Sequence, residues 1–140
     1  MPTNASAPER TPLPDIVIRA ADEERLAELA NGLLDSRPEL GEGLLSELAR
    51  ARLASDEALP ANTVQMGSTV TFEAEGRRRQ VTLVYPAEAN IDAGRISVAT
   101  PIGTALLGLA EGQSIDWTAR DGRVQQLTVV AVAQGDAGAA

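Results

Sequence analysis

The residue types in this chain exclude most side-chain chemistry. The sequence contains no cysteine and no histidine, so thiolate nucleophiles, disulfides, zinc-finger ligation and Ser-His or Cys-His arrangements are ruled out. Carboxylates and arginines are the groups that remain. We therefore predict no catalytic residue, no bound cofactor and no metal ligand, and the sequence indicates a protein that is not an enzyme.

Three acidic residues surround a break between two predicted helices: Asp35, Glu39 and Glu42. Acids beside a helix N-terminus interact favourably with the helix dipole, which is a simple stabilising role. Carboxylates are also groups that can approach a magnesium ion. The residues alone leave both roles open.

The basic residues predict no nucleic-acid site. The formal net charge is −8, and all twelve basic residues are arginine, so the chain as a whole lacks the positive footprint of a nucleic-acid-binding protein. The only basic run, Arg77-Arg78-Arg79, is a candidate contact for an acidic partner or an RNA phosphate. It adjoins Gly76 in a predicted hairpin, and most such runs are solvated turns. Direct sequence-specific binding to DNA or RNA is not expected.

Two amphipathic helices are predicted to carry the acids. The first is expected to begin at Asp22, whose carboxylate can cap it. The second begins either with a capping box at Ser36 or with Arg37 as the cap and Pro38 at the first helical position. Apolar residues recur at helical spacing in both, as Leu26, Leu29, Ala30 and Leu33, and then as Leu40, Leu44, Leu45, Leu48 and Ala51. A tight loop between two such helices predicts a hairpin.

The length and composition of this hairpin lead to two further expectations. Helices of about 12 to 13 and about 16 residues would each span on the order of 20 to 25 Å. Gly41 and Gly43 each cost the second helix about 1 kcal/mol relative to alanine. We therefore expect the hairpin tip to be mobile.

From Val64 onward the apolar period changes to two, which predicts half-buried antiparallel strands. The alternating residues are Val70, Phe72 and Ala74, then Val81, Leu83 and Tyr85, and later Leu127, Val129 and Ala131. Turn residues separate them at Glu75-Gly76, Asp92-Ala93-Gly94 and Asp121-Gly122, which predicts a meander of four or five strands. Residues 101–109 have helical spacing instead and predict a short helix packed on one sheet face. Leu106, Leu107, Leu109, Phe72 and Trp117 are the predicted core.

The predicted organisation is α+β. A helical hairpin covers residues 15–59 and a β domain covers 60–133, while 1–14 and 134–140 are tails with too little apolar surface to pack. No signal peptide and no run of roughly 18 apolar residues is present, so we expect a cytoplasmic protein without a membrane segment. The leucine stripes can satisfy each other within one hairpin, so a monomer is expected.

Several ordered motifs resemble the C-terminal domain of Gre transcription factors. They are Val64-Gln65-Met66-Gly67-Ser68-Thr69-Val70-Thr71-Phe72, Thr82-Leu83-Val84-Tyr85-Pro86, residues 96–109 and Glu111-Gly112-Gln113-Ser114-Ile115. The resemblance covers about residues 15 to 133. Within that family, the short helices and the 82–86 motif are most similar to the Rnk branch, the regulators of nucleoside diphosphate kinase.

This resemblance implies a fold and a partner. It implies a C-terminal part like FK506-binding proteins, an N-terminal antiparallel coiled coil, and docking of the C-terminal domain on the rim of the RNA polymerase secondary channel. Thr100, Pro101, Ile102 and Gly103 occupy the place of a Ser-Pro step that Gre factors use in docking, so the resemblance makes them the expected partner-binding residues. The same residues also have a structural explanation, because proline is favoured at a helix start.

The resemblance also gives the acids at the tip a possible role. Gre cleavage factors send a long coiled coil down the channel, and two tip carboxylates help to hold a catalytic metal. Asp35, Glu39 and Glu42 lack the D-x-x-E loop pattern of those factors, and the predicted hairpin is far shorter. We therefore expect a regulator that binds polymerase, competes with Gre-type and DksA-type factors and does not stimulate transcript cleavage. The alternative is a cleavage factor that delivers its tip carboxylates.

Prolyl isomerase activity is not expected from the residues. The fold alone would suggest prolyl isomerase activity, but that pocket is aromatic-lined and this chain has one Trp, one Tyr and one Phe. The residues leave open whether an effect on nucleoside diphosphate kinase would come from direct binding or from altered transcription.

Overall fold

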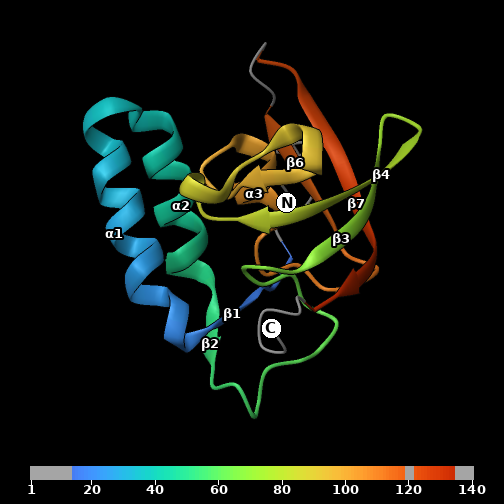
Figure 1. Cartoon of the computed structure of the whole chain (residues 1–140), viewed down its shortest axis with the longest axis horizontal. Helices are drawn as coiled ribbons and strands as arrows, with labels where there is room; N and C mark the ends of the chain where they lie inside the picture. The colour runs from blue at the N-terminus through green and yellow to red at the C-terminus, as the bar shows by residue number, and fades with distance from the viewer. Residues whose placement is uncertain (1–13, 119–121, 135–140) are drawn as a thin grey trace, which may run out of the picture.

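The computed structural model describes residues 14–118 and 122–134. A helical pair lies beside a curled β-sheet (Figure 1), which confirms the mixed α+β class. The pair consists of α1 (Ala20–Ser36) and α2 (Pro38–Arg50), flanked by the short strands β1 (Val17–Arg19) and β2 (Arg52–Ala54). The predicted tails lie almost wholly outside the described residues.

Helix α1 begins earlier than predicted. Its N-cap is Arg19, and Asp22 lies in the first turn, so the prediction that Asp22 caps this helix was wrong. The Asp22 carboxylate instead accepts a hydrogen bond from Arg19 Nη1 at 3.3 Å. Helix α2 begins with Arg37 as the cap and Pro38 at the first position, which confirms the second of the two predicted starts. The helices have 17 and 13 residues, so α1 is longer and α2 shorter than expected.

Gly41 is explained by the packing of the two helices. A Cβ atom at this position would lie 2.7 Å from the Ala30 carbonyl oxygen and 2.8 Å from the Leu34 backbone nitrogen. Only glycine lets α2 approach α1 this closely. Gly43 differs, because a Cβ atom there would meet nothing within 4 Å. Close helix packing therefore requires glycine at position 41 of α2 but not at position 43.

The root of the hairpin is a two-stranded parallel sheet. Strand β1 pairs with β2 in the register Val17 to Arg52 and Arg19 to Ala54. Val17 also donates its backbone N–H to the Gly108 carbonyl at 3.2 Å. Both ends of the hairpin are therefore joined to each other and to the rest of the chain.

The main sheet has five strands in the order β5-β4-β3-β7-β6. They are β3 (Thr69–Ala74), β4 (Arg77–Val84), β5 (Arg95–Ser97), β6 (Ser114–Thr118) and β7 (Val124–Ala133). All neighbours are antiparallel except β4 and β5, which are parallel. The predicted antiparallel meander was therefore wrong in two respects: β5 is parallel to β4, and the consecutive strands β5 and β6 lie at opposite edges of the sheet. Two short 3-10 helices, η2 (Pro86–Glu88) and η3 (Ile91–Ala93), return the chain before β5 begins, so that β5 runs in the direction of β4.

The core lies between the sheet, the hairpin and helix α3 (Pro101–Leu106), which contacts both α2 and β6. Phe72, Leu106, Leu107 and Leu109 are fully buried, as predicted. Trp117 is only half-buried at the edge of this core. Helix α3 ends before the predicted Leu109 because the chain turns at Gly108, whose φ is 83°. Within the described part of the chain, no helix has the length and apolar character needed to cross a membrane.

Candidate partner-binding site

The segment from Thr100 to Gly103 is held firmly at the start of α3. The Thr100 hydroxyl accepts a hydrogen bond from the Gly103 N–H at 3.0 Å and donates one to the Ser97 carbonyl at 2.8 Å. Gly103 is buried, and a Cβ atom there would lie 2.1 Å from the Ser97 carbonyl oxygen. Of the four predicted partner-binding residues, Gly103 therefore supports the segment from within, while Thr100, Pro101 and Ile102 remain partly exposed.

A small pocket of about 350 Å³ lies beside these exposed residues, and we call it the apolar pocket. Pro101, Ile102 and Ile91 of η3 all line it, and Ile91 is 84% exposed. The lining residues are Ala89, Ile91, Arg95, Ile96, Ser97, Thr100, Pro101, Ile102 and Trp117. Arg95 supplies the only charged side chain among them. The pocket can therefore accept an apolar side chain from a partner.

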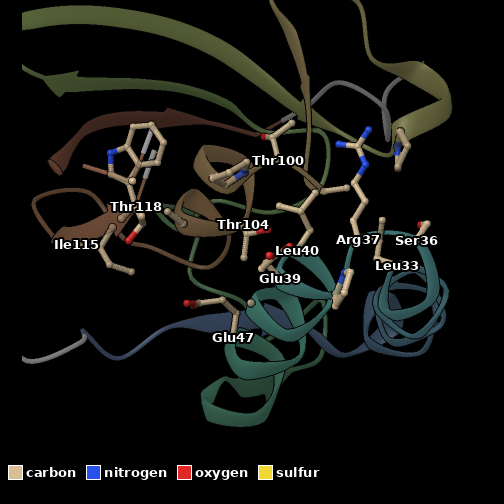
Figure 2. Close-up of a pocket in the computed structure, with 18 of the residues that line it drawn as sticks. Leu33, Ser36, Arg37, Glu39, Leu40, Glu47, Thr100, Thr104, Ile115 and Thr118 are labelled. Carbon is tan, nitrogen blue, oxygen red and sulfur yellow. The ribbon is translucent and has the colours of Figure 1, made fainter. Parts of the chain in front are cut away.

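A larger hollow of about 1110 Å³ lies between part of the hairpin and the β domain, and we call it the cleft. One wall is formed by the tip of the hairpin and by α2, and the other by α3, β6 and Pro86. Figure 2 shows Glu39, Leu40 and Glu47 on α2, facing Thr104 and Ile115 of the β domain across this space. Thr100, Pro101 and Trp117 line both the cleft and the apolar pocket, so the two hollows adjoin.

Glu47 is a largely buried acid of the cleft. Its side chain is 13% exposed, and burial raises the pKa of its carboxyl, an effect that the nearby Arg50 guanidinium partly offsets. Arg50 Nη2 lies 2.8 Å from the Glu47 carboxylate, while its Nη1 donates to the Pro14 carbonyl. This pair anchors the end of α2 and places a carboxylate at the wall of the cleft.

The three predicted tip acids do not converge. Asp35, Glu39 and Glu42 are all exposed, and they belong to the end of α1 and to two successive parts of α2. Glu39 alone lines the cleft together with Thr100 and Pro101. In the described part of the chain, no group of three or more acids could hold a metal ion.

The arginine run begins a strand, not a turn. The turn of this hairpin is Glu75-Gly76, and Arg77 to Arg79 open β4. Arg78 Nη2 lies 2.7 Å from the carboxylate of Glu73 on the neighbouring strand β3. The Arg79 guanidinium lies 6.0 Å from the centre of the Phe72 ring. Two of the three arginines therefore have partners within the sheet, although an exposed ion pair of this kind contributes little stability.

A buried amide fixes the direction in which the hairpin leaves the β domain. Gln65 is fully buried, and its side chain accepts a hydrogen bond from the Arg19 N–H at 2.9 Å. The same side chain donates to the Val17 carbonyl at 2.8 Å and to the Thr63 hydroxyl at 3.0 Å. Because Arg19 is the N-cap of α1, Gln65 determines where the helix starts relative to the sheet.

A second contact holds α1 against the end of β4. The Arg25 guanidinium lies 3.8 Å from the centre of the Tyr85 ring, a cation–π geometry. Burial, and to a smaller degree the Asp22 carboxylate, raise the pKa of Tyr85 to about 12. Pro86, which follows, lines the cleft. Gln65 and Tyr85 together therefore set the separation between the two walls.

Sequence reasoning did not find the cleft. Its walls come from residues 33–47 and 86–122, segments that are far apart in the chain, and no local pattern joins Glu47 to Trp117. Glu39, Thr100 and Pro101 were noted for other reasons, and an acid at position 47 lies between Leu44 and Leu48 of the apolar stripe. Ile91 gave no signal, because a single apolar residue in a turn is common.

Comparison with known proteins matches this architecture. The family described as transcription elongation factor GreA/GreB, C-terminal, matches residues 59–134, and the Rnk N-terminus family matches residues 14–53. The chain belongs to the GreA/GreB family. The two adjoining matches confirm the resemblance to its Rnk branch and place the chain among transcription elongation factor-like regulators.

Individual relatives agree with this family. The chain is 37% identical over 119 residues to the regulator of nucleoside diphosphate kinase of Escherichia coli (strain K12), covering 84% of this chain and 88% of that protein. It is 38% identical over 126 residues to the transcription elongation factor GreA of Rhodospirillum rubrum, covering 81% and 80%. It is similar in structure to a GreA/GreB factor from Nitrosomonas europaea, with a TM-score of 0.68, 39% identity and coverage of 86% and 98%.

Proposed function

We propose that this protein is a non-enzymatic transcription regulator that binds RNA polymerase at the rim of the secondary channel. Docking would occur through the β domain, with competition against Gre-type and DksA-type factors and without stimulation of transcript cleavage. The observation that carries the proposal is the apolar pocket beside Thr100, Pro101 and Ile102. These are the residues that the family resemblance assigns to docking.

The form of this segment suits a protein partner. Thr100 and Gly103 fix the backbone by hydrogen bonding and close packing, so little conformational freedom is lost when a partner binds. Ile91 and Ile102 supply apolar side chains to the lining of the pocket. Exposed apolar groups around a concave surface are typical of binding sites.

The hairpin supports the absence of cleavage stimulation. Its helices of 17 and 13 residues have lengths of about 26 and 20 Å at 1.5 Å rise per residue. The tip carboxylates are spread over both helices instead of sharing one site. A regulator that occupies the channel entrance needs neither the reach nor a shared carboxylate site.

Five finer expectations belong to the same proposal. The α1–α2 pair acts as an antiparallel coiled coil, and the sheet with α3 corresponds to the arrangement found in FK506-binding proteins. The apolar faces of α1 and α2 pack on each other and on the β domain, which favours a monomer. We place the protein in the cytoplasm, where polymerase is. The similar Escherichia coli protein is named for nucleoside diphosphate kinase, and we propose that any such effect here acts through transcription.

A paired assay with RNA polymerase core enzyme tests this function. We expect the protein to bind the enzyme, to displace a Gre factor, and to leave the RNA of a backtracked complex uncleaved. Ile102→Glu places a charge in the apolar pocket and should weaken binding about tenfold or more. Val124→Glu is the matched control, because Val124 is 68% exposed and lies outside both hollows. Stimulated cleavage would instead identify a Gre-type cleavage factor, and absence of binding would refute the proposal.

A further inference from the structure

The surface of α2 that forms one wall of the cleft contains a shallow groove at a glycine. Glu39, Gly43 and Glu47 are four residues apart in turn, so they lie along one face of the helix. All three line the cleft. Gly43 has no side chain, and a Cβ atom there would meet nothing within 4 Å. The wall therefore has a gap about 12 Å long between two carboxylates, at 1.5 Å rise per residue.

The charges of the cleft are mostly negative. Its described lining includes the acids Glu39, Glu47 and Asp116 against the single base Arg37. Arg50 pairs with Glu47, but no salt bridge within the described residues engages Glu39 or Asp116. Charge complementarity therefore favours a basic occupant. A second copy of this chain is disfavoured, because it carries the same net charge of −8.

The rest of the lining is suited to apolar side chains. Leu33, Leu40 and Ile115 contribute from both walls. Trp117 is half-buried there, and its indole N–H has no hydrogen-bond partner in the described part of the chain. At about 1110 Å³ the cleft exceeds most small-molecule sites. Acids beside an apolar floor match an amphipathic segment with basic residues.

We propose that the cleft is a second docking site, which adjoins the apolar pocket and shares Thr100, Pro101 and Trp117 with it, and that it accepts a basic amphipathic helix of a partner protein. The helix lies along α2, with its backbone against Gly43 and its apolar face toward Leu40 and Ile115. Two lysine or arginine side chains spaced two turns apart reach Glu39 and Glu47. This is the helix-in-groove mode of recognition, and it does not depend on which protein occupies the apolar pocket.

A synthetic helical peptide with a leucine face and two lysines seven positions apart is the probe, and its lysine-to-glutamate version is the control. Binding is read from the fluorescence of Trp117, the single tryptophan of the chain. We expect the lysine peptide to bind the full chain and the glutamate peptide to bind at least about tenfold more weakly, the size expected when a charge pair is lost.

Gly43→Leu fills the gap, and we expect it to abolish peptide binding while the protein stays folded, because leucine is a better helix former than glycine. Gly32→Leu is the matched control, since Gly32 is also helical with nothing within 4 Å of a Cβ atom, and it lies on α1 outside the cleft. Its binding should equal that of the unchanged chain. Equal loss in both variants, or no loss in Gly43→Leu, would overturn the proposal.

Charge reversal gives a test that does not depend on the size of a side chain. The change Glu39→Arg should weaken binding of the lysine peptide and strengthen binding of the glutamate peptide, because Glu39 is the exposed acid of the pair that the lysines reach and no salt bridge within the described residues engages it. Unchanged preference would overturn the proposal, as would failure of the lysine peptide to bind the full chain at all. Polymerase binding is measured in parallel: Ile102→Glu should lose polymerase and keep the peptide, so failure of the proposed function and failure of this docking site give different results.

Discussion

The pKa of the Tyr85 side chain depends on the position of the hairpin. Its ring is 9% exposed and lies beneath the Arg25 guanidinium of α1. Burial raises the pKa of its phenol from 10.0 to about 12. Since the neutral phenol is the form that the folded protein favours, this residue contributes stability below pH 10. That contribution is lost as the pH rises through 12.

This shift leads to a prediction at the scale of one residue. The phenolate absorbance of the folded protein should show one transition near pH 12, because the chain has a single tyrosine. The denatured chain should titrate near pH 10 instead. Tyr85→Phe should remove the loss of stability between pH 10 and 12 that this group causes. A folded-state transition at the ordinary value would contradict the burial of Tyr85 against α1.

Helix α2 offers a prediction at the scale of one element, because its two glycines face opposite surroundings. Gly41→Ala forces a methyl group against the Ala30 carbonyl, so we expect a loss of about 1 to 3 kcal/mol in the free energy of unfolding. Gly43→Ala meets open space and should raise that free energy by up to about 1 kcal/mol. Chemical denaturation of the two variants measures both effects, and similar changes in the two would contradict the packing.

The elements also show what could be predicted from the sequence. Periodicity located both helices and the long strands, and the Thr100-Pro101 step located the start of α3. The direction of β5 was predicted wrongly, because it depends on η2 and η3, whose short 3-10 turns have no hydrophobic period. Asp22 was taken for a cap, but pairing of β1 with β2 carries the chain straight into α1 at Ala20.

The candidate site, too, could be predicted only where it depends on local sequence. Residues 100–103 lie on one continuous segment, so their place could be found from local sequence. The cleft depends on contacts of long sequence separation, such as the hydrogen bond from Arg19 N–H to Gln65. A local pattern contains no information about which distant surfaces meet. That is why Glu39 could be noted as a tip acid, while its position opposite Thr100 and Trp117 could not.

At the scale of the whole molecule, the two walls of the cleft keep their separation because the root of α1 is hydrogen-bonded to a side chain buried in the β domain. Gln65→Leu removes the partners of the Arg19 N–H and the Val17 carbonyl. Each buried polar group left without a partner costs about 1 to 3 kcal/mol. Gln126→Leu is the control, because Gln126 is exposed on β7.

We expect Gln65→Leu to lower the free energy of unfolding well beyond the control and also to loosen α1 before the sheet unfolds. The second effect is measurable through Tyr85, because its pKa depends on burial beneath that helix. In Gln65→Leu the phenol should titrate below about 12 and closer to 10 while the sheet remains folded. An unchanged titration with reduced stability would mean that Gln65 stabilises the β domain without orienting the hairpin, and the width of the cleft would then depend on the other contacts between the hairpin and the β domain, including the Arg25–Tyr85 contact.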